Sequence, residues 1–172
     1  MDVLIIIDML NGFCRNGYPL SLPKSTTKVE EYIKDLIINF DYNNNKYFFL
    51  CDNHSVNSTE FKQYPVHCLK DSIEAEIVDT LIDFSNNKNI VYKDTLSIFY
   101  NTKLELELKS LDIENIHLTG VLTDICVLFA AYEFRNRGYN VFIHKKGVQA
   151  LSDEKQEYFI NYINEFLGVE II

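Results

Sequence analysis

Short apolar runs along the chain alternate with longer segments in which apolar residues recur every three or four positions. The short runs are rich in β-branched residues and cover residues 3–7, 46–51, 89–92, 116–119, 140–144 and 169–172. Most are apolar throughout rather than at every second position, which is typical of strands buried on both faces of a parallel sheet. We therefore predict about six parallel strands.

The segments between these runs have the spacing of amphipathic helices. The expected helices begin after Ser25 and end at the asparagines 43–45, and cover 72–84, 103–110, 123–137 and 153–167. Strand and helix alternate throughout, without a repeat or a low-complexity linker. The sequence thus predicts an α/β fold of three layers in a single domain over residues 1–172, with helices on both faces of the sheet.

Composition and charge exclude several classes of function. The net charge is −9 and no basic run is longer than two residues, whereas nucleic-acid binding requires clustered Lys and Arg. No apolar stretch approaches the length of a membrane span, and the N-terminal residues lack the features of a signal peptide. We expect a cytoplasmic protein that binds neither nucleic acid nor membranes, with its four cysteines as free thiols.

Charged residues stand where three of the predicted strands end. Asp8, Asp52 and Lys93 follow the first three apolar runs, and Gly120 follows the fourth. Each has a simpler interpretation, a turn-forming aspartate or a surface lysine. However, the carboxyl ends of parallel strands meet at one edge of the sheet, where ligands bind in open α/β folds. We therefore predict one site built from these residues.

Cys126 lies in the first turn of the helix that follows Gly120. The partial positive charge of a helix N-terminus favours thiolate over thiol, so this cysteine is a candidate nucleophile, and a small buried hydrophobic residue is the alternative. Thr123 is the expected N-cap of the helix, and Gly138 the expected stop.

Two histidines and two carboxylates lie in a short, loop-rich stretch after the second strand: Asp52, His54, Glu60 and His67. Nitrogen and oxygen ligands suit zinc, iron or manganese, whereas calcium takes only oxygen. In extended chain, the Asp-x-His spacing points both side chains to the same side. We predict a metal site here and keep a polar surface loop as the alternative.

Three segments resemble the isochorismatase-like cysteine hydrolase superfamily, in particular its nicotinamidase (pyrazinamidase) branch. Residues 120–127 resemble the Gly-x-x-Thr-Asp-x-Cys-Val segment of that branch. Lys93, with Ser97 and Phe99, is similar to the superfamily's Lys-x-x-x-Ser-x-Phe segment, and Asp52, His54, Glu60 and His67 match the metal ligands of nicotinamidases one by one. The resemblance spans nearly the whole chain.

The resemblance implies hydrolysis of nicotinamide to nicotinate and ammonia, an activity of NAD salvage. Cys126 would attack the amide carbon and form a thioester, Asp8 would accept and return the proton, and Lys93 would stabilise the thiolate. The backbone N–H groups of Leu122 and Cys126 would form the oxyanion hole, with a cis peptide after Val121.

The resemblance also implies how the substrate is held. Phe13 and Tyr64 would flank the pyridine ring, and a divalent metal ion, with zinc favoured and iron or manganese as alternatives, would anchor its nitrogen. For Phe13, packing beneath its loop is the alternative. The expected partner is a small-molecule amide, and a homo-oligomer is left open.

Two segments depart from the family pattern. The usual Asp-x-Gln-Asn-Asp-Phe reads Asp8-Met9-Leu10-Asn11-Gly12-Phe13, and Asp71-Ser72 replaces the Gly-Thr that commonly follows the His-Cys segment. Two alternatives to a nicotinamidase therefore stay open. One is a cysteine amidohydrolase for carbamoyl or ureido compounds, and the other is a catalytically silent metal-binding or interaction domain.

Overall fold

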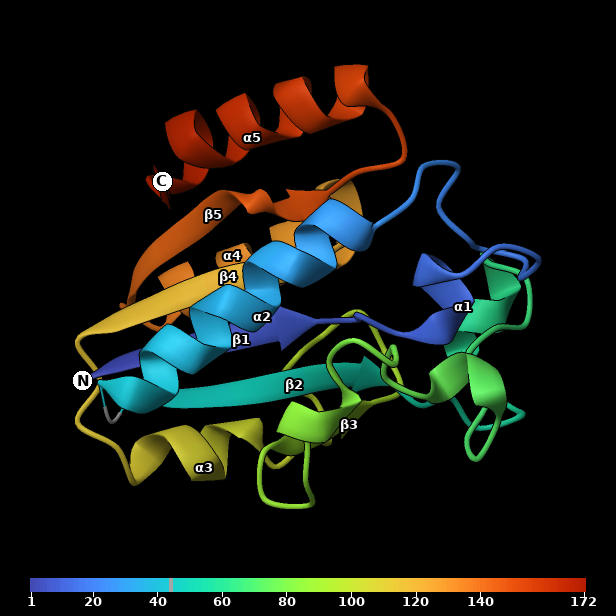
Figure 1. The fold of residues 1–172 in the computed structure, drawn as a ribbon, viewed down its shortest axis with the longest axis horizontal. Coiled ribbons are helices and arrows are strands. Elements are labelled where there is room, and N and C mark those ends of the chain that lie inside the picture. The colour runs from blue at the N-terminus through green and yellow to red at the C-terminus, as the bar shows by residue number, and fades with distance from the viewer. Residues whose placement is uncertain (44) are drawn as a thin grey trace.

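The computed structural model describes residues 1–43 and 45–172, and six parallel strands form its sheet (Figure 1). The strands lie in the order β3-β2-β1-β4-β5-β6. They are β1 (Asp2–Ile7), β2 (Lys46–Asp52), β3 (Ile90–Lys93), β4 (Asn115–Val121), β5 (Asn140–Gln149) and β6 (Glu170–Ile171). The α/β fold with a parallel sheet of about six strands is thus confirmed.

Helices cover both faces of this sheet, as predicted. They are α1 (Asn11–Cys14), α2 (Thr27–Tyr42), α3 (Leu104–Lys109), α4 (Leu128–Asn136) and α5 (Asp153–Leu167). In Figure 1, α2 crosses in front of the sheet and α4 lies behind it. The expected end of α2 at residues 43–45 is met at Asn43, its C-cap, whereas Asn44 lies outside the described residues.

The two layers of helices explain why β1 is apolar at every position. Leu4 and Ile6 pack with α2 in one hydrophobic cluster. Val3, Ile5 and Ile7 pack with α3, α4 and α5 in the other. Successive side chains of a strand point to opposite faces, so a strand between two layers of helices needs an apolar residue at each position.

Residues 72–84 do not form the helix that their spacing predicts. Two short 3₁₀ turns stand at Ile73–Ala75 and Ile82–Phe84, separated by extended chain. The extended part bonds to the segment after β1, because Val78 donates its N–H to the Met9 carbonyl at 3.0 Å and Ile77 forms an antiparallel bridge with Leu10. These long-range bonds use backbone groups that a helix would need.

Two smaller expectations also fail. The asparagines, glycines and prolines of residues 11–23 predict a loop, but this segment begins with the single turn of α1. Thr123 does not cap a helix, since its hydroxyl donates to Gln156 Oε1 at 2.8 Å. A five-residue π-helical turn, Thr123–Val127, precedes α4 instead, and π-turns within helices are frequent at functional sites. None of the helices in the described ranges is both long and apolar enough to cross a bilayer.

Candidate active site

A buried group of three charges lies at the carboxyl edge of the sheet. The register of β2 and β3 pairs Asp52 with Lys93. The Lys93 ammonium lies 2.9 Å from Asp8 Oδ2 and also donates to Asp52 Oδ1. All three residues are at most 3% exposed. The structure therefore brings together the three charged strand ends that the sequence singled out.

Asp8 is fixed in this position by β2. Its N–H donates to the Leu50 carbonyl at 2.8 Å, and its Oδ1 accepts from the Asp52 N–H at 2.9 Å. Its φ of +50° lies in the left-handed region, which few residues other than glycine adopt. The backbone thus turns at the end of β1 and leaves Oδ2 beside Lys93.

Gly120 allows β4 to approach the end of β1 closely. Its φ is +108°, and a Cβ atom there would lie 2.0 Å from the Ile7 carbonyl oxygen, so only glycine fits. The next peptide, between Val121 and Leu122, is cis as expected, and it leads into the turn that carries Cys126.

Cys126 joins the group of charges. It is 6% exposed, and its Sγ lies within 4.8 Å of one carboxylate oxygen from Asp8 and one from Asp52. The predicted nucleophile, proton acceptor and ammonium are therefore in one buried place, although they come from the turn after β4, the residue after β1 and the end of β3.

The thiol of Cys126 does not have the lowered pKa that its helical position suggested. Burial raises the pKa well above its ordinary value, Lys93 opposes the rise, and the charge of Asp8 adds to it. The pKa of Asp8 is raised as well, first by burial and then by the charge of Asp52. Cys126 therefore holds its proton beside a carboxylate that is able to accept it.

The second oxygen of Asp52 faces two histidines. Asp52 Oδ2 lies 3.5 Å from His54 Nε2 and 3.8 Å from His67 Nε2. One ligand atom from each of the three residues fits within a 4.8 Å cluster, and both histidines are buried. Asp52 thus links Lys93 on one side to a group of metal-ligating side chains on the other.

Hydrogen bonds at the opposite ring nitrogens orient both imidazoles. His54 Nδ1 lies 3.0 Å from Asp94 Oδ1, and His67 Nδ1 lies 2.8 Å from the Pro65 carbonyl. Such partners leave each Nε2 for a metal ion and fix the tautomer. Asp94 is a functional residue that the sequence pattern did not single out, although its place directly after Lys93 at a strand end was a usable signal.

Two buried polar atoms of this cluster have no hydrogen-bond partner, which suits the binding of a divalent cation. Among the described residues, His54 Nε2 and Glu60 Oε1 are buried without a hydrogen-bond partner, and buried polar atoms are rarely left so. Glu60 Oε2 lies 3.9 Å from His54 Nε2, so Glu60 borders the tight group of Asp52, His54 and His67. Two imidazoles and carboxylates are a donor set for zinc, iron or manganese.

Although burial opposes it, the carboxylates of Asp52 and Asp94 raise the pKa of His54 to about 9. A metal ion takes neutral imidazole, so its binding would have to displace the proton from His54.

A small cavity of about 30 Å³ is lined by Cys126 and by His67 of the metal-ligating group. Phe13 and Tyr64, the two residues expected to flank a substrate ring, both line it. Other lining residues are Leu20, Asp52, Glu60, Leu96, Leu122 and Ile125. This volume is close to the share of one water molecule in the liquid, so a ring enters only if these side chains move apart.

Helix α5 holds the turn that carries the cysteine, a role that the sequence did not suggest. Lys155 donates to the buried Asp124 carboxylate at 3.0 Å, and Gln156 accepts from Thr123. Both contacts join residues about thirty positions apart, and nothing in the local pattern of either segment announces the pairing.

Comparisons with known proteins give the family and the fold that this chain resembles. The model of the Isochorismatase domain matches residues 2–171. The crystal structure of pyrazinamidase/nicotinamidase from Streptococcus mutans is 29% identical, covers 100% of both chains and has a TM-score of 0.91. That of nicotinamidase PncA from Bacillus subtilis is 28% identical, covers 99% of this chain and 98% of the other, and has a TM-score of 0.89.

The pyrazinamidase of Pyrococcus horikoshii, solved in complex with zinc, is 23% identical. It covers 99% of this chain and 98% of that one, with a TM-score of 0.88, and it shares the fold.

Proposed function

The chain belongs to the isochorismatase family, and from this premise we propose that it is a nicotinamidase, which hydrolyses nicotinamide to nicotinate and ammonia through a thioester on Cys126. One observation carries the proposal: the Cys126 sulfur lies within 4.8 Å of an Asp8 carboxylate oxygen, and Asp8 pairs with Lys93, in a buried place beside the group Asp52, His54 and His67. Two structures at 28–29% identity bear the name nicotinamidase and support the choice of substrate.

The first half of the reaction transfers the acyl group to sulfur. Asp8 accepts the thiol proton while Sγ attacks the amide carbon, and the carbonyl π electrons move onto oxygen. The N–H of Leu122, which donates to no acceptor among the described residues, and that of Cys126 stabilise this oxyanion. The carbon–nitrogen bond then breaks, and the proton on Asp8 passes to the departing ammonia.

The second half releases the acid. Asp8 removes a proton from water as the water oxygen attacks the thioester carbon, the carbon–sulfur bond breaks, and the proton returns to the thiolate. Lys93 stays positively charged throughout, since Asp52 and Asp8 raise its pKa against the effect of burial. The ammonium therefore stabilises the negative charge as it alternates between Asp8 and the sulfur.

We also propose that Asp52, His54 and His67 bind a divalent metal ion, with Glu60 at its side. When bound, the ion would supply a Lewis acid that anchors the pyridine nitrogen. Zinc is favoured by the donor set and by the pyrazinamidase solved with zinc, and iron and manganese suit the same ligands. Phe13 and Tyr64 then flank the ring, because both line the cavity that His67 and Cys126 also line.

The test is ammonia release from nicotinamide, pyrazinamide and an N-carbamoyl amino acid, measured with and without a chelator. Cys126→Ala and Asp8→Asn are each expected to lower kcat for nicotinamide by about 10⁴-fold or more, as losses of catalytic groups that act as a unit do. Cys14→Ala, which removes a thiol that does not line the active-site cavity, is the matched control and keeps the wild-type rate.

Three results would contradict the proposal in different ways. Wild-type hydrolysis of nicotinamide no faster than that of Cys126→Ala would exclude the proposed nicotinamidase activity. Preference for the carbamoyl compound, unaffected by the chelator, would indicate an amidohydrolase of another specificity. Inactivity on every substrate, together with a Cys126 thiol that does not react with iodoacetamide, would indicate a silent binding domain.

A further inference from the structure

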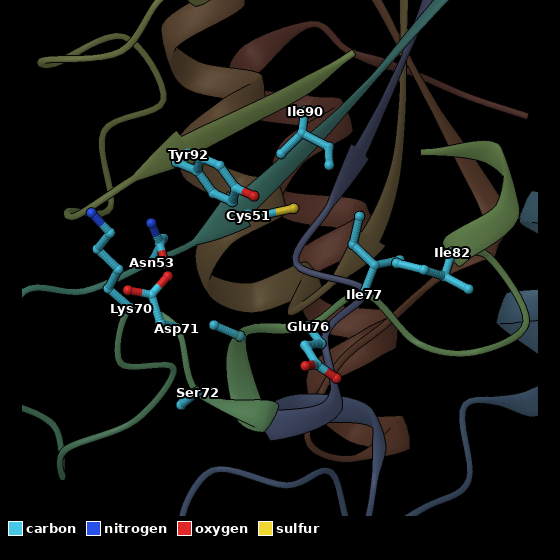
Figure 2. Close-up of a pocket in the computed structure, with 11 residues that line it drawn as sticks. Cys51, Asn53, Lys70, Asp71, Ser72, Glu76, Ile77, Ile82, Ile90 and Tyr92 are labelled. Carbon is cyan, nitrogen blue, oxygen red and sulfur yellow. The ribbon is translucent and has the colours of Figure 1, made fainter. Parts of the chain in front are cut away.

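A second and larger cavity, of about 570 Å³, lies on the reverse face of the strands that carry the catalytic charges (Figure 2). Cys51 pairs with Tyr92 in the register of β2 and β3, directly before the pair Asp52 and Lys93. Neighbouring residues of a strand point to opposite faces, so Cys51 and Tyr92 face away from the catalytic group. Part of the segment 72–84, which does not form the predicted helix, makes the opposite wall of the cavity.

The inner wall of this cavity is apolar. Figure 2 shows Cys51, Ile90 and Tyr92 on the strands. Ile77 and Ile82, from the segment 72–84, lie opposite them. Cys51 and Ile77 are buried, whereas Tyr92 is 54% exposed and Ile82 is 43% exposed. An apolar ligand group bound here would therefore remove exposed hydrophobic surface of Tyr92 and Ile82, and of the ligand itself, from water.

The rim of the cavity is polar and has no partners of its own. Among the described residues, the side chains of Asn53, Lys70, Asp71, Ser72 and Glu76 make no side-chain hydrogen bond or ion pair with another residue. The Ser72 hydroxyl oxygen is buried and still lacks a partner. A concave apolar wall with a few convergent polar groups, in a volume of several hundred Å³, is the usual form of a small-molecule site.

The charges on the rim favour a ligand with a positive charge. Two carboxylates, Asp71 and Glu76, stand against the single ammonium of Lys70. The net charge of −9 for the whole chain also attracts cations, and the exposed ring of Tyr92 offers a face to them. We propose that this cavity is a binding site for a small organic cation with an aromatic or apolar body, separate from the active site.

The experiment uses three probes that share a phenyl ring and differ in charge: benzylamine, benzyl alcohol and benzoate. Each is titrated into the ¹⁵N-labelled full-length protein, and amide shifts are followed by NMR. Benzylamine is expected to give saturable shifts at Glu76, Ile77 and Ile90. Benzyl alcohol is expected to bind about fivefold more weakly, and benzoate not to bind, because the carboxylates favour only the cation.

Variants test whether the named groups bind the probe. The double variant Asp71→Asn, Glu76→Gln is expected to weaken benzylamine binding by about five- to tenfold, and Tyr92→Ala by about two- to fivefold. Asp83→Asn is the matched control, since it removes a charge from the same exposed segment without lining the cavity, and it leaves the affinity unchanged.

The proposal is overturned if benzoate binds as tightly as benzylamine, or if the double variant behaves like Asp83→Asn. Benzylamine shifts confined to the surroundings of Cys126 would overturn it as well. So would sedimentation that shows a dimer which Tyr92→Ala dissociates, with no benzylamine binding, because the cavity would then be an interface between copies of the chain.

Discussion

Replacement of Lys93 by methionine tests whether the buried ammonium holds two carboxylates together. Methionine keeps most of the apolar length of lysine and removes the charge. Asp8 and Asp52 would then share a buried place, at most 3% exposed, without their counter-ion. We expect the folded protein to lose stability through this uncompensated charge rather than through a cavity.

The geometry sets the magnitude. At an effective dielectric constant of about 20, one pair of unit charges at 2.9 Å is worth about 6 kcal/mol, and Lys93 makes two such pairs. The variant no longer buries an ammonium, which returns several kcal/mol. A carboxylate that takes up a proton in the variant relieves a further part of the loss. We expect a net loss in the free energy of unfolding of about 3–5 kcal/mol, the range seen when one partner of a buried ion pair is removed.

The assay is urea unfolding followed by circular dichroism, with a chelator present so that a metal ion does not replace the missing charge. Lys109→Met is the control, since Lys109 is 69% exposed in its pair with Glu105, and a loss below about 0.5 kcal/mol is expected there. Adding Asp8→Asn to Lys93→Met removes one of the two like charges and is expected to restore about 1–2 kcal/mol.

The pH dependence gives a second readout with a definite sign. Without Lys93, the pKa of at least one carboxylate rises in the folded protein above its unfolded value, so the folded state binds more protons as the pH falls. The difference between variant and wild type should therefore shrink from pH 7 to pH 5. A variant as stable as the wild type, or one whose deficit grows on acidification, would refute this account of Lys93.

Three further predictions concern other parts of the chain. Gly120→Ala should cost several kcal/mol in unfolding free energy because its Cβ meets a carbonyl at 2.0 Å. Gly138→Ala, at φ +82° with open space around it, should cost about 1 kcal/mol, and equal losses would contradict the steric explanation. Asp94→Asn should weaken zinc binding by about 10- to 100-fold in competition with a chromophoric chelator, since Asp94 bonds His54 Nδ1, and an unchanged affinity would exclude that role. Burial lowers the pKa of His144 to about 4 from 6.5, so the free energy of unfolding from urea titrations should fall as the pH drops below 6.5, by about 2 kcal/mol at pH 5, and His144→Asn should remove this slope. A slope that His144→Asn leaves intact would assign it to other groups.

Much of the fold could be predicted from the sequence because burial leaves a local periodic signature. Every strand was found, and α5 lies at the predicted residues 153–167, although β5 continues to Gln149, beyond its predicted end at residue 144. The continuous apolar run of β1 indicates that helices cover both faces of the strand, but it does not identify which helices they are. The strand ends also placed Asp8, Asp52 and Lys93 at one edge, since parallel strands end on the same side.

Other features depend on contacts between distant segments, and only the tertiary structure decided them. Residues 72–84 have helical spacing, yet bonds to the chain after β1 hold Ile77 and Val78 extended, and parts of this segment line the second cavity. Cys126 follows a helix-start pattern, yet burial beside two carboxylates raises the pKa of its thiol. A sequence pattern records which side of an element is apolar, whereas a hydrogen-bond partner or a pKa depends on all the groups that folding brings near. Those groups come from anywhere in the chain.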